Sequence, residues 1–102
     1  MASGLKSIFT DDLDHCIICG KPAERHHIFG KFSRKKSEED GLILPLCPEH
    51  HTEGKNAVHL NYDMRRLTYI LGQYAWESQY DGIAPKGVAR DLFRERYGKS
   101  YL

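Results

Sequence analysis

The sequence predicts a small α+β domain in which two short strands are followed by helices. Two short segments of strand length, next to glycine or proline, lie at residues 24–29 and 42–46, and residues 62–80 carry apolar side chains at the three-and-four spacing of a helix. Cysteine and histidine residues gather in the first half of the chain, between Cys16 and His59. A length of 102 residues is enough for one domain, 1–102.

The composition excludes several classes of protein. With 40% hydrophobic and 28% charged residues, the chain has the balance of a globular protein rather than of a disordered, collagen-like or coiled-coil one. The longest apolar run, residues 42–46, is far shorter than the roughly 20 residues of a membrane span. Residues 1–14 contain three aspartates and lack the apolar segment of a secretory signal. We therefore expect a soluble cytoplasmic protein with no membrane partner.

The two strands are bounded by residues that interrupt regular structure. Gly30 ends the strand 24–29, and Pro45 places the strand 42–46 at a sheet edge or marks its end. Between them, the polar and charged segment 31–40 predicts a loop.

Helices are expected after the strands. Pro48 suits the first turn of a short helix that ends or weakens at Gly54. Asn61 can cap the helix 62–80 through its side chain. A last helix is expected over residues 85–97.

Two pairs of residues have the spacing that lets both side chains of a pair reach one metal ion. Zinc takes four thiolate and imidazole ligands in a closed tetrahedral site, and a small domain gains folding free energy from such a site. Gly20 permits a tight chain reversal after the first pair. The alternative is that the cysteines are buried small hydrophobic residues. The sequence predicts a structural zinc held by Cys16, Cys19, Cys47 and His50.

Several histidines are left over once His50 is assigned to zinc. Neighbouring residues on a strand point to opposite faces, so we expect His26 and His27 to have different roles, one as a metal ligand and one as a general base. His51 points about 100° around the helix from His50 and can serve a second ion. The alternative is a pair of surface histidines beside a zinc-binding turn.

Charge is unevenly distributed although the net charge is only +1. Residues 21–37 hold six basic side chains and one acidic one, a local charge of +5, whereas residues 38–49 have a local charge of −4. The basic segment predicts contacts with nucleic-acid phosphates, and the alternative is a solvated loop with compensating charges. The expected DNA-binding residues are Arg25, Lys31, Arg34, Lys35 and Lys36.

Three segments of the chain resemble the HNH endonucleases, which have a ββα-metal core. These segments are residues 24–29 (ERHHIF), 41–51 (GLILPLCPEHH) and 58–59 (VH). The likeness is to small phage and prophage HNH proteins and to the HNH domain of phage recombination-enhancement nucleases. It implies a zinc-containing HNH core at 14–60, a helical extension at 61–102 and a place in the bacterial cytoplasm, with a phage or prophage origin.

The resemblance also implies roles for individual residues. His27 matches the general base that activates water. His26 and His51 match ligands of the catalytic divalent ion, and His59 follows the phage-type pattern as a further ligand. The ion would be Mg²⁺, Mn²⁺, Co²⁺, Ni²⁺ or Zn²⁺, with histidine ligands favouring the transition metals. The implied activity is hydrolysis of DNA phosphodiester bonds with weak or no sequence specificity.

One position departs from the HNH pattern. The family carries an asparagine about five residues before the third zinc cysteine, where it helps to orient the base, and here that position is Leu42. An alternative function is therefore a non-catalytic, zinc-stabilised nucleic-acid-binding module. A third class is a protein-interaction domain, although aromatic residues at helical spacing more often form a core. Its contact residues would be Tyr69, Tyr74, Trp76 and Tyr80.

Overall fold

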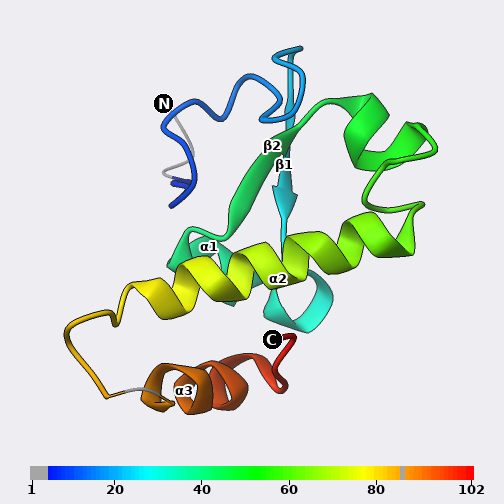
Figure 1. Cartoon of the computed structure of the whole chain (residues 1–102). Helices are drawn as coiled ribbons and strands as arrows, with labels where there is room; N and C mark the ends of the chain where they lie inside the picture. The colour runs from blue at the N-terminus through cyan, green and yellow to red at the C-terminus, as the bar shows by residue number, and fades with distance from the viewer. Residues whose placement is uncertain (1–4, 86) are drawn as a thin grey trace.

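Two antiparallel strands form the centre of the fold, and helices lie across one end of them (Figure 1). The computed structural model describes residues 5–85 and 87–102. Strand β1 (Glu24–His27) pairs with strand β2 (Ile43–Leu46), and each is shorter than the strand predicted from the sequence. The α+β class predicted from the sequence is confirmed.

The later helices follow in the expected order with shorter bounds. Helix α2 (Tyr62–Ser78) begins after Asn61, whose side-chain oxygen accepts a hydrogen bond from the Met64 N–H (3.0 Å), as expected for a cap. Helix α3 (Val88–Tyr97) ends at Gly98. The short helix expected after Pro48 is present as a π-helix, Glu49–Glu53.

Residues 31–40 form helical structure, so the prediction of a loop is wrong. A 3₁₀ turn (Lys31–Ser33) leads into helix α1 (Arg34–Asp40). Most residues of this segment are charged, and its one buried residue, Ser37, is small and polar. Its hydroxyl donates to the Phe29 carbonyl (2.8 Å) and accepts from the Phe29 N–H (3.1 Å). These bonds satisfy backbone groups just after β1 and hold α1 against the strand.

An aromatic core joins the sheet to the C-terminal helices. The Phe29 ring lies 5.4 Å from Tyr69, 5.6 Å from Phe93 and 4.8 Å from Tyr97, measured between ring centroids. Trp76 is buried and packs against Phe93 at 5.5 Å. Of the four aromatic residues that a protein-interaction domain would use, Tyr69, Trp76 and Tyr80 pack in or against the core, whereas Tyr74 is exposed.

One carboxylate connects helices α1, α2 and α3. Asp40, at the end of α1, accepts hydrogen bonds from Trp76 Nε1 in α2 (3.0 Å) and from Arg96 Nε in α3 (2.6 Å). The Tyr97 hydroxyl donates to the same oxygen. Burial and the Asp40 carboxylate raise the pKa of Tyr97 above its ordinary value, so this hydroxyl keeps its proton.

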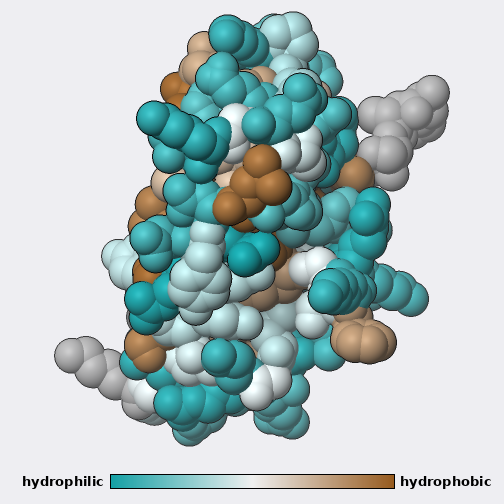
Figure 2. Space-filling model, turned by 90° about the vertical axis from the view of Figure 1, so that its right-hand side faces the viewer, coloured by the Kyte–Doolittle hydropathy of each residue, from teal (hydrophilic) through white to brown (hydrophobic). Residues whose placement is uncertain are grey.

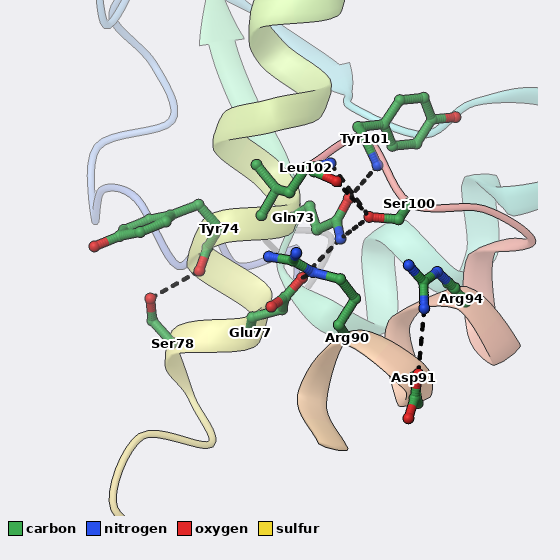
Figure 3. A network of polar contacts seen from close by, with 10 residues as sticks. All are labelled: Gln73, Tyr74, Glu77, Ser78, Arg90, Asp91, Arg94, Ser100, Tyr101 and Leu102. Atoms are coloured by element: carbon green, nitrogen blue, oxygen red, sulfur yellow. Dashed lines mark hydrogen bonds and ion pairs between the residues drawn. The ribbon is translucent and has the colours of Figure 1, made fainter. Parts of the chain in front are cut away.

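A second polar network fixes the C-terminal segment on α2 (Figure 3). The buried Gln73 amide donates to Glu77 (2.7 Å) and to the Ser100 hydroxyl (2.9 Å), and its oxygen accepts from the Tyr101 N–H (2.6 Å). Arg90 of α3 donates to the same Glu77 carboxylate (3.3 Å). Each hydrogen-bonding group of this buried amide therefore has a partner.

The face shown in Figure 2 is mostly hydrophilic, and its apolar side chains appear as separate spots. Within the described part of the chain, no helix combines the length and the apolar character needed to cross a membrane.

Ser37→Ala should lower the free energy of unfolding by about 1–3 kcal/mol, because two buried backbone groups of Phe29 lose their partner. Urea denaturation followed by Trp76 fluorescence measures the change. Ser78→Ala is the matched control, because the Ser78 hydroxyl donates to a carbonyl of its own helix, that of Tyr74. Equal unfolding free energies for Ser37→Ala and the parent protein would contradict the role of this hydroxyl.

Candidate metal centres and adjoining cavity

A tight turn brings the first cysteine pair beside β2. The turn is closed by hydrogen bonds from the Cys16 N–H to the Lys21 carbonyl (2.7 Å) and from the Gly20 N–H back to the Cys16 carbonyl (2.8 Å). Gly20 has a φ of 79°, a left-handed conformation that glycine adopts without strain. The Ile17 N–H donates to the Pro45 carbonyl of β2 (2.9 Å) and attaches the turn to the sheet.

The four residues predicted to bind structural zinc lie together, and we call them the zinc cluster. The ligand atoms of Cys16, Cys19, Cys47 and His50 are all within 4.8 Å of one another. Sγ of Cys19 and Sγ of Cys47 are 3.6 Å apart, and His50 Nδ1 lies 3.2 Å from Cys47 Sγ and 3.7 Å from Cys16 Sγ. A tetrahedral zinc with standard bond lengths would separate two sulfurs by about 3.8 Å and a sulfur from a nitrogen by about 3.6 Å. The zinc cluster therefore has the composition and size to hold a structural metal such as zinc.

The electrostatics of the zinc cluster also suit a cation. Burial has the largest single effect on the Cys16 thiol and raises its pKa. Hydrogen bonds from backbone N–H groups, mainly those of Cys47 and Cys19, and from the His50 side chain together outweigh burial. The pKa of Cys16 is therefore lowered to about 6. The Lys21 backbone lowers the pKa of Cys19, yet burial and the thiols of Cys47 and Cys16 together raise it. A divalent cation would relieve the repulsion between neighbouring thiolates.

The second cluster consists of three histidines from different elements, and we call it the histidine triad. His26 comes from β1, His51 from the π-helix and His59 from the loop before α2, and their ligand atoms lie within 4.8 Å of one another. Nε2 of His51 and Nε2 of His59 are 3.1 Å apart, close to the roughly 3.3 Å expected between two nitrogens on one tetrahedral ion. Within the described residues, Nε2 of His26 is buried and has no hydrogen-bond partner. A buried nitrogen without a partner beside two other imidazoles fits a metal ligand.

The π-helix explains how His51 and His59 reach one site although eight residues separate them. The His51 N–H donates to the Cys47 carbonyl (2.8 Å), and the His59 N–H returns to the His51 carbonyl (3.1 Å). The Gly54 N–H closes the π turn on the Glu49 carbonyl (2.9 Å), where a Cβ would lie 2.4 Å from that oxygen. Glycine is therefore required at position 54 by lack of space.

A carboxylate orients His51 toward the triad. Nδ1 of His51 lies 2.8 Å from Glu24 Oε1. An ionised carboxylate only accepts hydrogen bonds, so Nδ1 carries the proton and Nε2 presents its lone pair to the triad. This role of Glu24 was not predicted from the sequence. Glu24 precedes His26 by two residues on β1, which places both side chains on one face of the strand and could have indicated it.

Two members of the triad, His26 and His59, have lowered pKa values, which favours the uncharged form that binds metals. Burial, with smaller contributions from His51, His59 and His27, lowers the pKa of His26 from 6.5 to about 3. Burial also lowers the pKa of His59, and His51 and Arg65 lower it further. Neutral imidazole nitrogens are suitable ligands for a transition metal.

His27 has a different partner, as strand alternation predicts. Its Nε2 lies 2.8 Å from Glu38 Oε1 in α1, and 8% of its side chain is exposed. His26 and His27 nevertheless both line one cavity of about 590 Å³, together with His51 and His59. Glu38 was missed because its contact with His27 depends on α1, which the charge pattern did not predict.

Some of the basic residues predicted to contact DNA line this cavity. Arg25, Lys31 and Arg34 do so, and Arg65 of α2 joins them without having been predicted. Arg25 is also 3.4 Å from the exposed carboxylate of Asp14. The cavity therefore combines a cationic rim with the histidine triad.

The other two predicted basic residues lie elsewhere. The ammonium group of Lys36 donates to the Arg96 carbonyl in the last turn of α3 (2.7 Å), where a cation is favoured by the helix dipole. Lys35 is exposed on α1 and is not among the residues that line the cavity.

Comparison with models of known protein families, with curated proteins and with solved structures finds no match to this chain. The function is therefore inferred from the residues of the two clusters and the cavity.

Cys19→Ser should remove tightly bound zinc and lower the melting temperature by many degrees, because metal binding contributes directly to the folding of such a small domain. Elemental analysis and thermal melting of the same samples measure both effects. His15→Ala is the control, since His15 adjoins Cys16 but bonds to Asp12 instead of the cluster (2.8 Å). A Cys19→Ser protein with full zinc content and parental melting would contradict the structural-metal assignment.

Proposed function

We propose that this chain is a metal-dependent endonuclease of the HNH type that hydrolyses phosphodiester bonds in DNA. The observation that carries the proposal is the convergence of His26, His51 and His59 beside a cavity that His27 also lines. These are the four histidines to which the resemblance assigns the ion ligands and the general base. An isolated pair of histidines would carry no such argument.

The order of the elements supports a ββα-metal core within this proposal. β1 supplies His26 and His27, β2 leads into Cys47, and the π-helix supplies His50 and His51. The turn directly after the second strand thus supplies one ligand, His50 or His51, to each of the two proposed metal sites.

The chemistry of hydrolysis suits these groups. His27 would accept the proton of the attacking water, a role that neutral imidazole can fill near neutral pH. His26, His51 and His59 would hold the divalent ion, and three nitrogen ligands favour Mn²⁺, Co²⁺, Ni²⁺ or Zn²⁺ over Mg²⁺. When bound, such an ion would stabilise the charge that develops on the phosphate and on the leaving oxygen.

The cationic rim supports DNA as the substrate. Arg25, Lys31, Arg34 and Arg65 could contact backbone phosphates, which are shared by all sequences. We therefore propose weak or no sequence specificity. A bacterial cytoplasmic location and a phage or prophage origin form part of the same proposal and rest on the resemblance.

A zinc-stabilised DNA-binding module without catalysis is the second candidate. Leu42 favours it, because the family asparagine that helps to orient the base is missing at this position. The module would use the zinc cluster and the cationic rim equally well. It gives no reason for a buried His26 nitrogen that has no hydrogen-bond partner among the described residues and lies beside His51 and His59.

His27→Ala should lower the rate of DNA cleavage by about 10²–10⁴-fold while zinc content, melting temperature and DNA affinity stay close to those of the parent, because general-base catalysis contributes about this much. His51→Ala should instead weaken binding of the catalytic ion, so that excess Mn²⁺ partly restores its activity. Plasmid nicking across a metal titration measures both variants.

Two outcomes would count against these assignments. Parental cleavage rates in His27→Ala would exclude His27 as the base. A parent protein that cleaves no DNA with Mg²⁺, Mn²⁺, Co²⁺, Ni²⁺ or Zn²⁺ would favour the non-catalytic module.

Arg34→Ala should weaken DNA binding and reduce the slope of log affinity against log salt by about 0.9 for each phosphate that the protein no longer neutralises. Lys35→Ala is the matched control, because it removes the same charge from the next residue of α1, outside the cavity. Equilibrium binding to a short duplex at several salt concentrations measures the two slopes. Equal slopes for both variants would show that the cavity rim has no special part in binding.

A further inference from the structure

In the HNH pattern an asparagine helps to orient the base, but here that position is Leu42, whose side chain cannot form a hydrogen bond with His27. Leu42 is fully buried among apolar residues. Its backbone is used instead, since its carbonyl accepts from the Ile28 N–H (3.0 Å) and its N–H donates to the Ser37 carbonyl (2.8 Å). These bonds attach the end of α1 to the end of β1, close to His27.

Glu38 is the side chain that α1 brings to His27. Its Oε1 lies 2.8 Å from His27 Nε2. Because an ionised carboxylate accepts hydrogen bonds only, Nε2 must carry the proton, and in the neutral ring Nδ1 then keeps its lone pair. Nδ1 forms no hydrogen bond with any residue that the structure describes, and His27 lines the cavity. The contact thus leaves a basic nitrogen available for a water molecule.

The helix that carries Glu38 is held in place on other sides. Ser37 is bonded to both backbone groups of Phe29. The Glu39 carboxylate pairs with Arg96 (3.0 Å), and Asp40 accepts from Arg96 and Trp76. Because the residues next to Glu38 attach α1 to the strand and to α2 and α3, the position of Glu38 beside His27 is fixed.

We propose that Glu38 is the positioning residue of His27. It fixes the tautomer and the orientation of the imidazole and so takes over the task of the asparagine that Leu42 replaces. This inference rests on the proposed nuclease function for its effect on rate, whereas the orientation of the ring can be measured without activity.

The kinetic experiment compares Glu38→Ala, Glu38→Gln and the control Glu39→Gln, which removes a charge from the next residue but affects the contact with Arg96 instead of His27. Glu38→Ala should lower kcat by about 10- to 100-fold with KM for DNA little changed, as expected when a catalytic group loses its orienting partner. Glu38→Gln keeps an oxygen that can accept from Nε2 and should retain most of kcat. Glu39→Gln should cleave like the parent. Thermal melting verifies that all three variants are folded.

The spectroscopic experiment records long-range ¹H–¹⁵N correlations of the His27 ring in zinc-loaded protein. The parent and Glu38→Gln should show one tautomer, with the proton on Nε2. Glu38→Ala should show a mixture of tautomers or a rapidly exchanging ring. A His27 ring that gives the parental pattern in Glu38→Ala would overturn the proposal.

The kinetic outcomes are equally decisive. Parental kcat in Glu38→Ala would exclude a positioning role, and equal losses in Glu38→Ala and Glu38→Gln would assign the effect to the negative charge rather than to orientation. If the parent cleaves no DNA with any of the divalent ions, the proposed function fails together with the catalytic part of this inference. The tautomer measurement then still decides whether Glu38 orients His27.

Discussion

The zinc cluster and the histidine triad share one turn of backbone, and the positions of both depend on the adjacent residues His50 and His51 in that turn. His50 faces the cysteines, while His51 faces His26 and His59. Adjacent side chains on a helix diverge by about 100°, so one turn can serve two sites only if its backbone is held in place. A metal in the zinc cluster would fix His50 and therefore also limit the positions that His51 can take. Folding and the geometry of the cavity are linked through this single turn.

The buried His26 of the histidine triad lowers the free energy of unfolding of this small domain. Burying an imidazole nitrogen such as Nε2 of His26 without a hydrogen bond costs about 1–3 kcal/mol. The Glu24 carboxylate accepts a hydrogen bond from the neighbouring His51, but no described residue forms a hydrogen bond with Nε2 of His26. A local arrangement that opposes stability is more readily explained by a ligand than by packing.

The sequence predicts contacts between residues that are close in the chain, but not contacts that depend on how distant elements pack. The spacing of the cysteines and His50 predicts the zinc cluster because chain geometry over a few residues brings each pair together, and strand alternation separates His26 from His27 for the same reason. Glu38 and Arg65 were not predicted, because their places at the cavity depend on how helices pack on the strands. Helix α1 was missed because its one buried side chain, Ser37, is small and polar and carries no periodic apolar signal.

The Asp40 carboxylate also makes helix α1 depend on the C-terminal helices. It lies on the same helix as Arg34, which lines the cavity, but its hydrogen-bond donors, among them Trp76 and Arg96, come from α2 and α3. A fragment of residues 14–60 alone would lose the partners of this carboxylate and would expose the side of Phe29 that packs on Phe93. The strands and the C-terminal helices therefore depend on one another for folding.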